Sequence, residues 1–226
     1  MLKPRKRLVK AKLKEDKLLI FTARAQSFLD KYQKFIMYGV AGIVLIAAAA
    51  GFVNWSKSGA ERKASLEALM ARDAYKTGEL DEALTRINII LEDYSGTPSA
   101  GDALMMKGKI HEQRLEWDEA TATYKKLLSK YGSNKYWGFG ALYAMGAIEH
   151  GRGNYTGAAD TYRKAAMRYP DHYYAPAALI AAGEAYKEAH KYEDAEQVLS
   201  LVLTKYDKSR STDDARKILE ELIFMD

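Results

Sequence analysis

Residues 175–208 read APAALIAAGEAYKEAHKYEDAEQVLSLVLTKYDK, and the spacing of their small, aromatic and large side chains recurs three times upstream. Four sets of equivalent positions are separated by steps of 37, 38 and 37 residues. The sets are Ala83, Ala120, Ala158 and Ala195; Tyr94, Tyr131, Tyr169 and Tyr206; Ala71, Gly108, Gly146 and Gly183; and Leu80, Trp117, Tyr155 and Tyr192. Such a period predicts a repeat protein in which each unit buries its apolar face only against its neighbours.

Each unit contains two helical patterns joined by a polar turn. In the second unit, Leu104, Gly108 and His111 share one helical face, and a second amphipathic pattern follows at 117–127. Ser211 or Thr212, followed by two aspartates, marks the start of a last helix. We therefore predict an all-α fold: an α-solenoid of about four helix pairs, at about 62–97, 101–134, 138–172 and 175–208, with a capping helix at about 211–225.

These spacings resemble those of the tetratricopeptide repeat (TPR). The matching large, small, aromatic, small and large positions are Leu179, Gly183, Tyr186, Ala195 and Leu199, and Pro170 matches the terminal proline of that family. The usual TPR period is 34 residues, so the additional residues fall between units, as in YGSNKYWGFG at 131–140. This longer form, with its Tyr-Pro-Asp-x-x-x-Ala-x-x-Ala run at 169–178, looks like repeats of bacterial envelope proteins.

A stretch of 22 residues, 35–56, carries no charged side chain. As a helix it would be about 33 Å long, enough for the ~30 Å hydrocarbon core of a bilayer. Tyr38 and Trp55 lie near its ends, where aromatic rings favour the headgroup level. We predict an uncleaved transmembrane helix. The alternative is a cleavable signal peptide with small residues at 47–50, but the preceding segment and the apolar core are both too long for one.

Positive charge is concentrated ahead of this helix. Residues 1–34 hold eleven Lys or Arg and three Asp or Glu, so this segment carries +8, and the whole-chain charge of +5 leaves −3 for residues 57–226. The positive-inside rule then predicts a cytoplasmic N-terminus and a periplasmic repeat domain on the bacterial inner membrane. A mildly acidic repeat domain without a basic stripe argues against nucleic acid as a partner.

The basic segment also has an apolar helical face that leads into the span, formed by Leu18, Phe21, Ala25, Phe28, Tyr32 and Phe35. We expect an amphipathic helix here that lies against anionic membrane lipid. A partner helix bound to the same face and a basic anchor that only sets the topology are the alternatives.

The layout as a whole has a basic cytoplasmic segment (1–34), one span (35–56) and an external TPR domain (57–226). It is similar to the single-pass ancillary subunit family of the Sec translocon. That resemblance implies a membrane-anchored scaffold that helps exported proteins pass from the channel to periplasmic chaperones. The alternatives are a structural or assembly subunit of another membrane complex, respiratory or photosynthetic, and an envelope or division-site scaffold.

In TPR arrays the first helix of each unit lines the concave surface, and its exposed positions can be counted from the small residue. The groove predicted in this way suits an extended peptide or a helix held by a few apolar anchors. Ordinary solvated residues are the alternative. The candidate groove residues are Arg72, Tyr75, Met105, Lys109, Glu112, Tyr143, Ala147, His150, Ile180, Glu184 and Lys187.

Aromatic residues of two inter-repeat loops form a second candidate interface, because aromatic clusters on loops are typical of interfaces. Packing that fills the lengthened gap between units is the alternative, since large rings at a repeat boundary are commonly buried. These residues are Tyr136, Trp137 and Phe139 in one loop, and Tyr173 and Tyr174 in the next.

The sequence offers no catalytic set of residues. The absence of cysteine excludes a disulfide framework, a thiolate metal site and a cysteine nucleophile. His111-Glu112 lacks the second histidine of a zinc-protease helix, and His150, His172 and His190 fall in different units. Neither a glycine-rich phosphate loop nor a nucleophile elbow occurs. We therefore expect no enzymatic activity, no cofactor and no metal site.

Overall fold

The computed structural model describes residues 6–224, and over this range every regular element is an α-helix. Two compact units divide the chain between Ser56 and Lys57. The first helix, α1 (Lys6–Thr77), contributes residues to both units. Residues 1–5 of the predicted basic segment and residue 225 of the predicted cap lie outside the described residues.

Part of α1 is long and apolar enough to cross a membrane. This part lies within Lys31–Thr77, and none of its most apolar stretch is buried inside the protein. Large apolar side chains such as Phe35, Ile43 and Ile46 are exposed there. Spanning helices and N-terminal signal sequences share these two properties.

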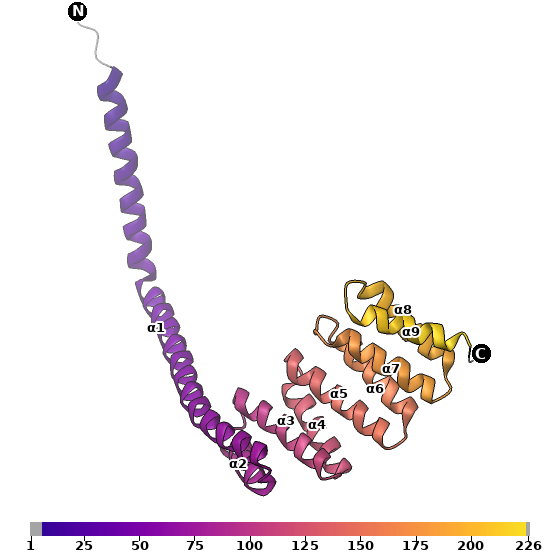
Figure 1. Cartoon of the computed structure of the whole chain (residues 1–226). Coiled ribbons are helices and arrows are strands. Elements are labelled where there is room, and N and C mark those ends of the chain that lie inside the picture. Colours follow the sequence, from indigo (N-terminus) through magenta and orange to yellow (C-terminus); the bar gives the residue numbers. More distant parts are fainter. Residues whose placement is uncertain (1–5, 225–226) are drawn as a thin grey trace, which may run out of the picture. The chain divides into compact units, whose positions relative to one another are not determined.

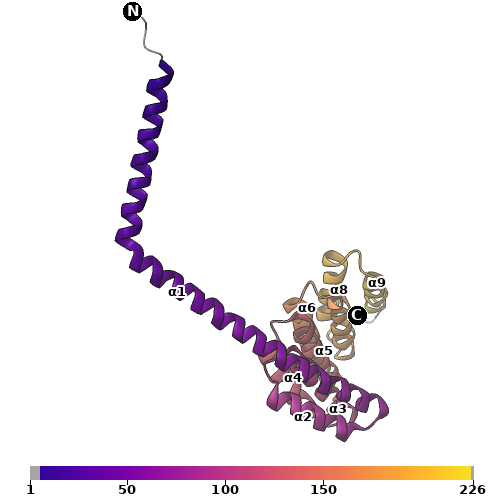
Figure 2. The same cartoon turned by 90° about the vertical axis from the view of Figure 1, so that its left-hand side faces the viewer.

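From Lys57 onward the chain forms a helical solenoid, which confirms the predicted fold class. From α2 on, each helix packs against the next one in the chain, and Figures 1 and 2 show the helices following one another side by side. After α1 come α2 (Leu80–Asp93), α3 (Pro98–Gln113), α4 (Trp117–Tyr131), α5 (Lys135–Gly151), α6 (Tyr155–Arg168), α7 (Ala175–Glu188), α8 (Tyr192–Lys205) and α9 (Ser211–Leu222).

Within a unit, the small position of the first helix faces a large side chain of the second helix. A Cβ atom on Gly108 would lie 2.4 Å from the Tyr124 ring, and one on Gly146 would lie 2.8 Å from the Tyr162 ring. The small residues therefore allow the helix pair to approach closely, with the rings lying across the glycines. The large positions are Ile87, Tyr124, Tyr162 and Leu199, a fifth set that keeps the same period.

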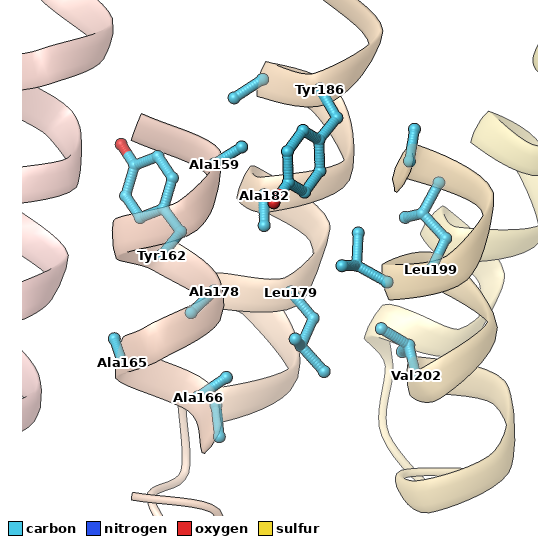
Figure 3. Packing of buried hydrophobic residues seen from close by; sticks show 14 of the residues in the cluster. Ala159, Tyr162, Ala165, Ala166, Ala178, Leu179, Ala182, Tyr186, Leu199 and Val202 are labelled. Carbon is cyan, nitrogen blue, oxygen red and sulfur yellow. The ribbon is translucent and has the colours of Figure 1, made fainter. Parts of the chain in front are cut away.

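The alanine set lies at the centre of the core. All four of these alanines are 0% exposed, so a larger side chain there would separate neighbouring helices. Figure 3 shows the packing of α6, α7 and α8, where Leu179 of α7 is directed toward Leu199 and Val202 of α8. At this boundary the core is therefore continuous from the third helix pair to the fourth.

The tyrosine set connects successive units through hydrogen bonds. The Tyr169 hydroxyl donates to the carbonyl oxygen of Gly132 at 2.6 Å, and the Tyr206 hydroxyl donates to that of Pro170 at 3.0 Å. Tyr131 donates in the same way to the carbonyl of Ser95. In each case the acceptor is the residue that follows the equivalent tyrosine of the preceding unit, so the link has the period of the repeat.

The turn inside each unit also repeats. Gly78, Leu115, Gly153 and His190 occupy equivalent positions and have φ values of 85°, 59°, 77° and 55°. This left-handed conformation is free of steric cost only for glycine. Two of the four turns therefore contain a residue with a side chain in a conformation that disfavours it.

Helix α9 closes the C-terminal end of the solenoid. It packs against α7 and α8, and it buries Thr212, Ala215, Ile218 and Leu222. The Nζ atom of Lys187 on α7 lies 2.9 Å from Oε2 of Glu221 on α9. Charged residues such as Asp213 and Arg216 occupy its outer face, as expected of a terminal cap in a solenoid.

Candidate partner-binding site

A cavity of about 570 Å³ lies between α3, α5 and the turn that leads from α6 into α7. It brings together residues from both interfaces predicted from the sequence. From the predicted groove come Met105, Lys109, Glu112, Tyr143 and Ala147, and from the predicted loops come Tyr136, Phe139, Tyr173 and Tyr174. The remaining lining residues are Tyr124, Gly140, Ala144, His172 and Ala177.

Tyr124 and Glu112 form a linked pair on one side of this cavity. The Tyr124 side chain is 0% exposed, and its hydroxyl donates a hydrogen bond to Oε1 of Glu112. Burial, followed by this hydrogen bond, raises the pKa of Tyr124 well above its usual value. The hydroxyl therefore remains a donor, and one oxygen of Glu112 is engaged inside the protein.

Stacked rings form a second side of the cavity. Phe139 stacks on His172 with ring centroids 3.9 Å apart and on Tyr143 with centroids 5.8 Å apart. The Nδ1 atom of His172 accepts a hydrogen bond from the backbone N–H of Tyr174 at 3.2 Å. Burial, together with the charge of Lys135, lowers the pKa of His172, which favours the neutral ring that this hydrogen bond requires.

Tyrosine rings stand around the cavity opening. Tyr136, Tyr173 and Tyr174 are 61%, 82% and 58% exposed, and Tyr143 is 37% exposed. Tyr173 and Tyr174 meet edge to face with centroids 4.9 Å apart. Rings held in this way offer a large contact area with few side-chain rotations to restrict on binding.

Three of the predicted groove residues that do not line the cavity pack within the solenoid. The His150 Nε2 atom lies 3.0 Å from Oε2 of Glu188, and Lys187 pairs with Glu221. Ile180 packs against the core cluster of α5 to α9. The structure therefore places these residues in contacts with neighbouring helices.

The other predicted groove residues lie at separate places on the solenoid. Arg72 is exposed on α1, Glu184 is exposed on α7, and Tyr75 packs against the first core cluster. None of the three lines the cavity. The cavity therefore unites only the second- and third-unit part of the predicted groove.

Trp137 is also directed away from the cavity. Its ring occupies the space beside Gly101 of α3, where a Cβ atom would lie 2.7 Å from the indole. Its Nε1–H donates to Oδ1 of Asp102 at 2.9 Å, and its ring meets that of Tyr131 at 5.6 Å. The side chain therefore fills the gap between the second and third units.

Of the five lining residues that were absent from both predicted interfaces, Tyr124 and His172 carry polar side chains. Tyr124 could have been found from the fifth periodic set, because it occupies the large position opposite a glycine. His172 carried no comparable signal, since its stacking on Phe139 joins the α6–α7 turn to helix α5, two parts of the chain that the local pattern does not pair.

Within residues 6–224, no group of three or more His, Cys, Asp or Glu side chains is arranged to hold a metal ion. The charged lining residues are Lys109 and Glu112. What the cavity offers is an aromatic surface with hydroxyl groups at its edge.

Comparisons with known proteins agree with this architecture. A family model described as a tetratricopeptide repeat matches residues 69–135. A crystal structure of a tetratricopeptide repeat protein from Parabacteroides merdae ATCC 43184 is 21% identical with a TM-score of 0.56; the match covers 71% of this chain and 60% of that one. The structure titled MamA 41-end from Desulfovibrio magneticus RS-1 is 15% identical with a TM-score of 0.51, and the match covers 71% of this chain and 93% of that one.

No curated protein matches the sequence. The repeat match and the two structures support a TPR protein. Because the two structures are only 21% and 15% identical in sequence to this chain, they show similarity of fold alone. TPR folds are typically non-catalytic scaffolds that bind protein partners. The cavity is therefore best examined as a protein-binding surface.

Proposed function

We propose that this chain is a membrane-anchored, non-catalytic scaffold that holds a protein partner in the cavity between α3, α5 and the α6–α7 turn. The observation that carries this proposal is the convergence of exposed rings from two units, Tyr136 and Tyr143 with Tyr173 and Tyr174, around one cavity. Exposed aromatic residues gathered in one concave place are enriched at interfaces.

The proposal includes a position in the cell. Residues 35–56 span the bacterial inner membrane, 1–34 lie on anionic lipid in the cytoplasm, and the TPR domain 57–226 extends into the periplasm. The charge difference between 1–34 and 57–226 supports this orientation. A partner bound in the cavity is then tethered to the membrane through the span.

The most specific role is a link between the Sec translocon and its clients or chaperones. The order of basic segment, apolar helix and TPR array supports this role. A fixed structural or assembly subunit of another membrane complex is the alternative, and it would contact its partners chiefly through the span.

Cross-linking distinguishes these roles. A photoreactive amino acid replaces Tyr143 in the full chain in cells, and a matched variant carries it at Lys125, an exposed α4 residue outside the cavity. We expect a cross-link at position 143 alone, to translocon clients or chaperones. Stoichiometric co-purification of a stable complex with no cross-link at position 143 would favour the alternative, and recovery of neither would contradict both.

The orientation is tested separately because the chain contains no cysteine. Single substitutions Ser133→Cys and Gln26→Cys introduce one thiol in the TPR domain and one before the span. We expect a membrane-impermeant maleimide to label position 133 but not position 26 in intact spheroplasts. Labelling of position 26 alone would reverse the proposed orientation.

A further inference from the structure

We propose that the cavity binds an extended, proline-rich segment of the partner, oriented by an acidic side chain that pairs with Lys109. This inference rests on the proposed function and names the chemical class of the partner. It follows from which hydrogen-bonding groups of the cavity are already used and which are not.

Six tyrosine hydroxyls of the solenoid hydrogen-bond within the protein, to carbonyls, carboxylates or a histidine, and none of the six stands at the cavity opening: Tyr124, Tyr131, Tyr169, Tyr186, Tyr192 and Tyr206. Of the other tyrosine hydroxyls of the solenoid, four surround the cavity opening, and those of Tyr75, Tyr94, Tyr155 and Tyr162 lie elsewhere. The hydroxyls of Tyr136, Tyr143, Tyr173 and Tyr174 make no hydrogen bond to any residue of the described chain. Burial and the charge of Glu184 raise the pKa of Tyr143, so its hydroxyl keeps its proton.

Each of these hydroxyls can also accept a hydrogen bond, but the other lining side chains add few acceptors. Oε1 of Glu112 accepts the Tyr124 hydroxyl, and Nδ1 of His172 accepts the backbone N–H of Tyr174. The lining includes no Asn, Gln, Asp or Arg side chain. A well-matched ligand is therefore rich in acceptors and poor in donors.

A proline-rich segment has this composition. Proline retains its carbonyl but has no backbone N–H, and the polyproline II conformation leaves every carbonyl free of internal hydrogen bonds. Its rings pack on aromatic faces, and its rigidity limits the entropy lost on binding. An α-helix satisfies most of its own carbonyls and would leave the four hydroxyls unused, while every hydroxyl of a saccharide adds a donor that needs an acceptor in the lining.

Lys109 gives the bound segment a direction. Its side chain is exposed on α3 and forms no ion pair with any described residue. The other charged lining residue, Glu112, shares its charge with the Tyr124 hydroxyl through a charge-assisted hydrogen bond. An acidic residue in the partner therefore finds a cation without a competing intramolecular partner.

Fluorescence anisotropy on the full chain in detergent tests the proposal with three labelled peptides of equal length. One repeats Pro-Pro-Glu, the second replaces each Glu with Lys, and the third is an alanine-rich helical peptide with the same number of Glu residues. We expect the Pro-Pro-Glu peptide to bind most tightly. Loss of one hydrogen bond in Tyr143→Phe should weaken it about threefold to tenfold, and loss of the ring in Tyr143→Ala should weaken it further.

Matched variants separate binding from folding. Tyr192→Phe removes a hydroxyl outside the cavity, and Lys125→Glu reverses a charge outside it, so both should bind like the original protein. Lys109→Glu should make the Lys peptide bind more tightly than the Glu peptide. Each variant is also melted, and only those with an unchanged Tm are compared.

The outcomes distinguish this inference from the proposed function. Tighter binding of the helical peptide, or equal weakening by Tyr192→Phe and Tyr143→Phe, would overturn the proline-rich partner. A cross-link at position 143 without binding of either proline peptide would also overturn it while leaving the scaffold role intact. Failure of both experiments would remove the proposed function as well.

Discussion

The second and third units of the solenoid differ from the fourth unit in what their first helices face. In α3 and α5, Met105 and Tyr143 border an open cavity, whereas Lys187 at the end of α7 is paired with Glu221 of α9. The glycines of the second and third units lie against tyrosine rings, while Gly183 lies against Leu199. One repeated helix pair therefore builds an open surface or a closed end, depending on side-chain size and on the element that follows.

The largest effect is expected where a ring lies on a glycine. Gly108→Ala places a methyl group 2.4 Å from the rigidly buried Tyr124 ring, so we expect a loss of about 2–3 kcal/mol in unfolding free energy. Thermal unfolding of the full chain measures it.

A double variant sharpens this test. Gly108→Ala combined with Tyr124→Ile copies the Ala71 and Ile87 pair of the first unit and should recover most of the loss. A single variant within about 0.5 kcal/mol of the original protein would show that the middle units do not depend on glycine-to-ring contact.

The next effect concerns the hydroxyl link between units. Tyr169→Phe leaves the Gly132 carbonyl without its donor in a buried place, which should cost about 1–2 kcal/mol in unfolding free energy. Tyr94→Phe is the matched control, because the Tyr94 hydroxyl bonds to no described residue. Equal losses in the two variants would mean that the links do not stabilise the middle of the solenoid.

A smaller effect, of opposite sign, is expected at the turns. Leu115→Gly removes a side chain from a residue with φ of 59° and should stabilise the protein by about 0.5–1 kcal/mol, after the greater freedom of glycine in the unfolded chain is deducted. Gly78→Leu at the equivalent turn should destabilise it. Urea denaturation measures both variants, and a destabilised Leu115→Gly protein would contradict the reasoning.

The smallest effect is expected at the closed end. The hydrogen bond from Lys187 lowers the pKa of Glu221, so this pair stabilises α9 at neutral pH and is lost as the pH falls through that lowered pKa. Glu221→Gln should speed amide exchange in α9 at neutral pH and leave α5 unchanged. Glu220→Gln, an exposed neighbour, is the control, and unchanged α9 exchange in Glu221→Gln would show that apolar contacts alone close the end.

The periodic sets were sufficient to predict the fold. The same spacing recurs in both helices of every pair and at the small positions where the two helices touch. The cavity was only partly predictable. Counting from the small residue assigned the same role to Tyr143 and Lys187, but the count contains no information on α9, which engages Lys187. Loop composition likewise grouped Trp137 with Phe139, although Gly101 leaves a space for the indole and His172 covers the Phe139 ring.

The hydroxyl links have a consequence for how such a chain can change in length. Each tyrosine bonds to the residue after its counterpart, so the junction has the same form wherever the chain is cut at equivalent places. Excision of residues 132–169 would join Tyr131 directly to Pro170 and leave Tyr206 its acceptor, while it removes Tyr143 and Phe139 from the cavity. Whole units can therefore be duplicated or deleted in a single genetic step without redesign of the junction, so the binding surface can change while the fold persists.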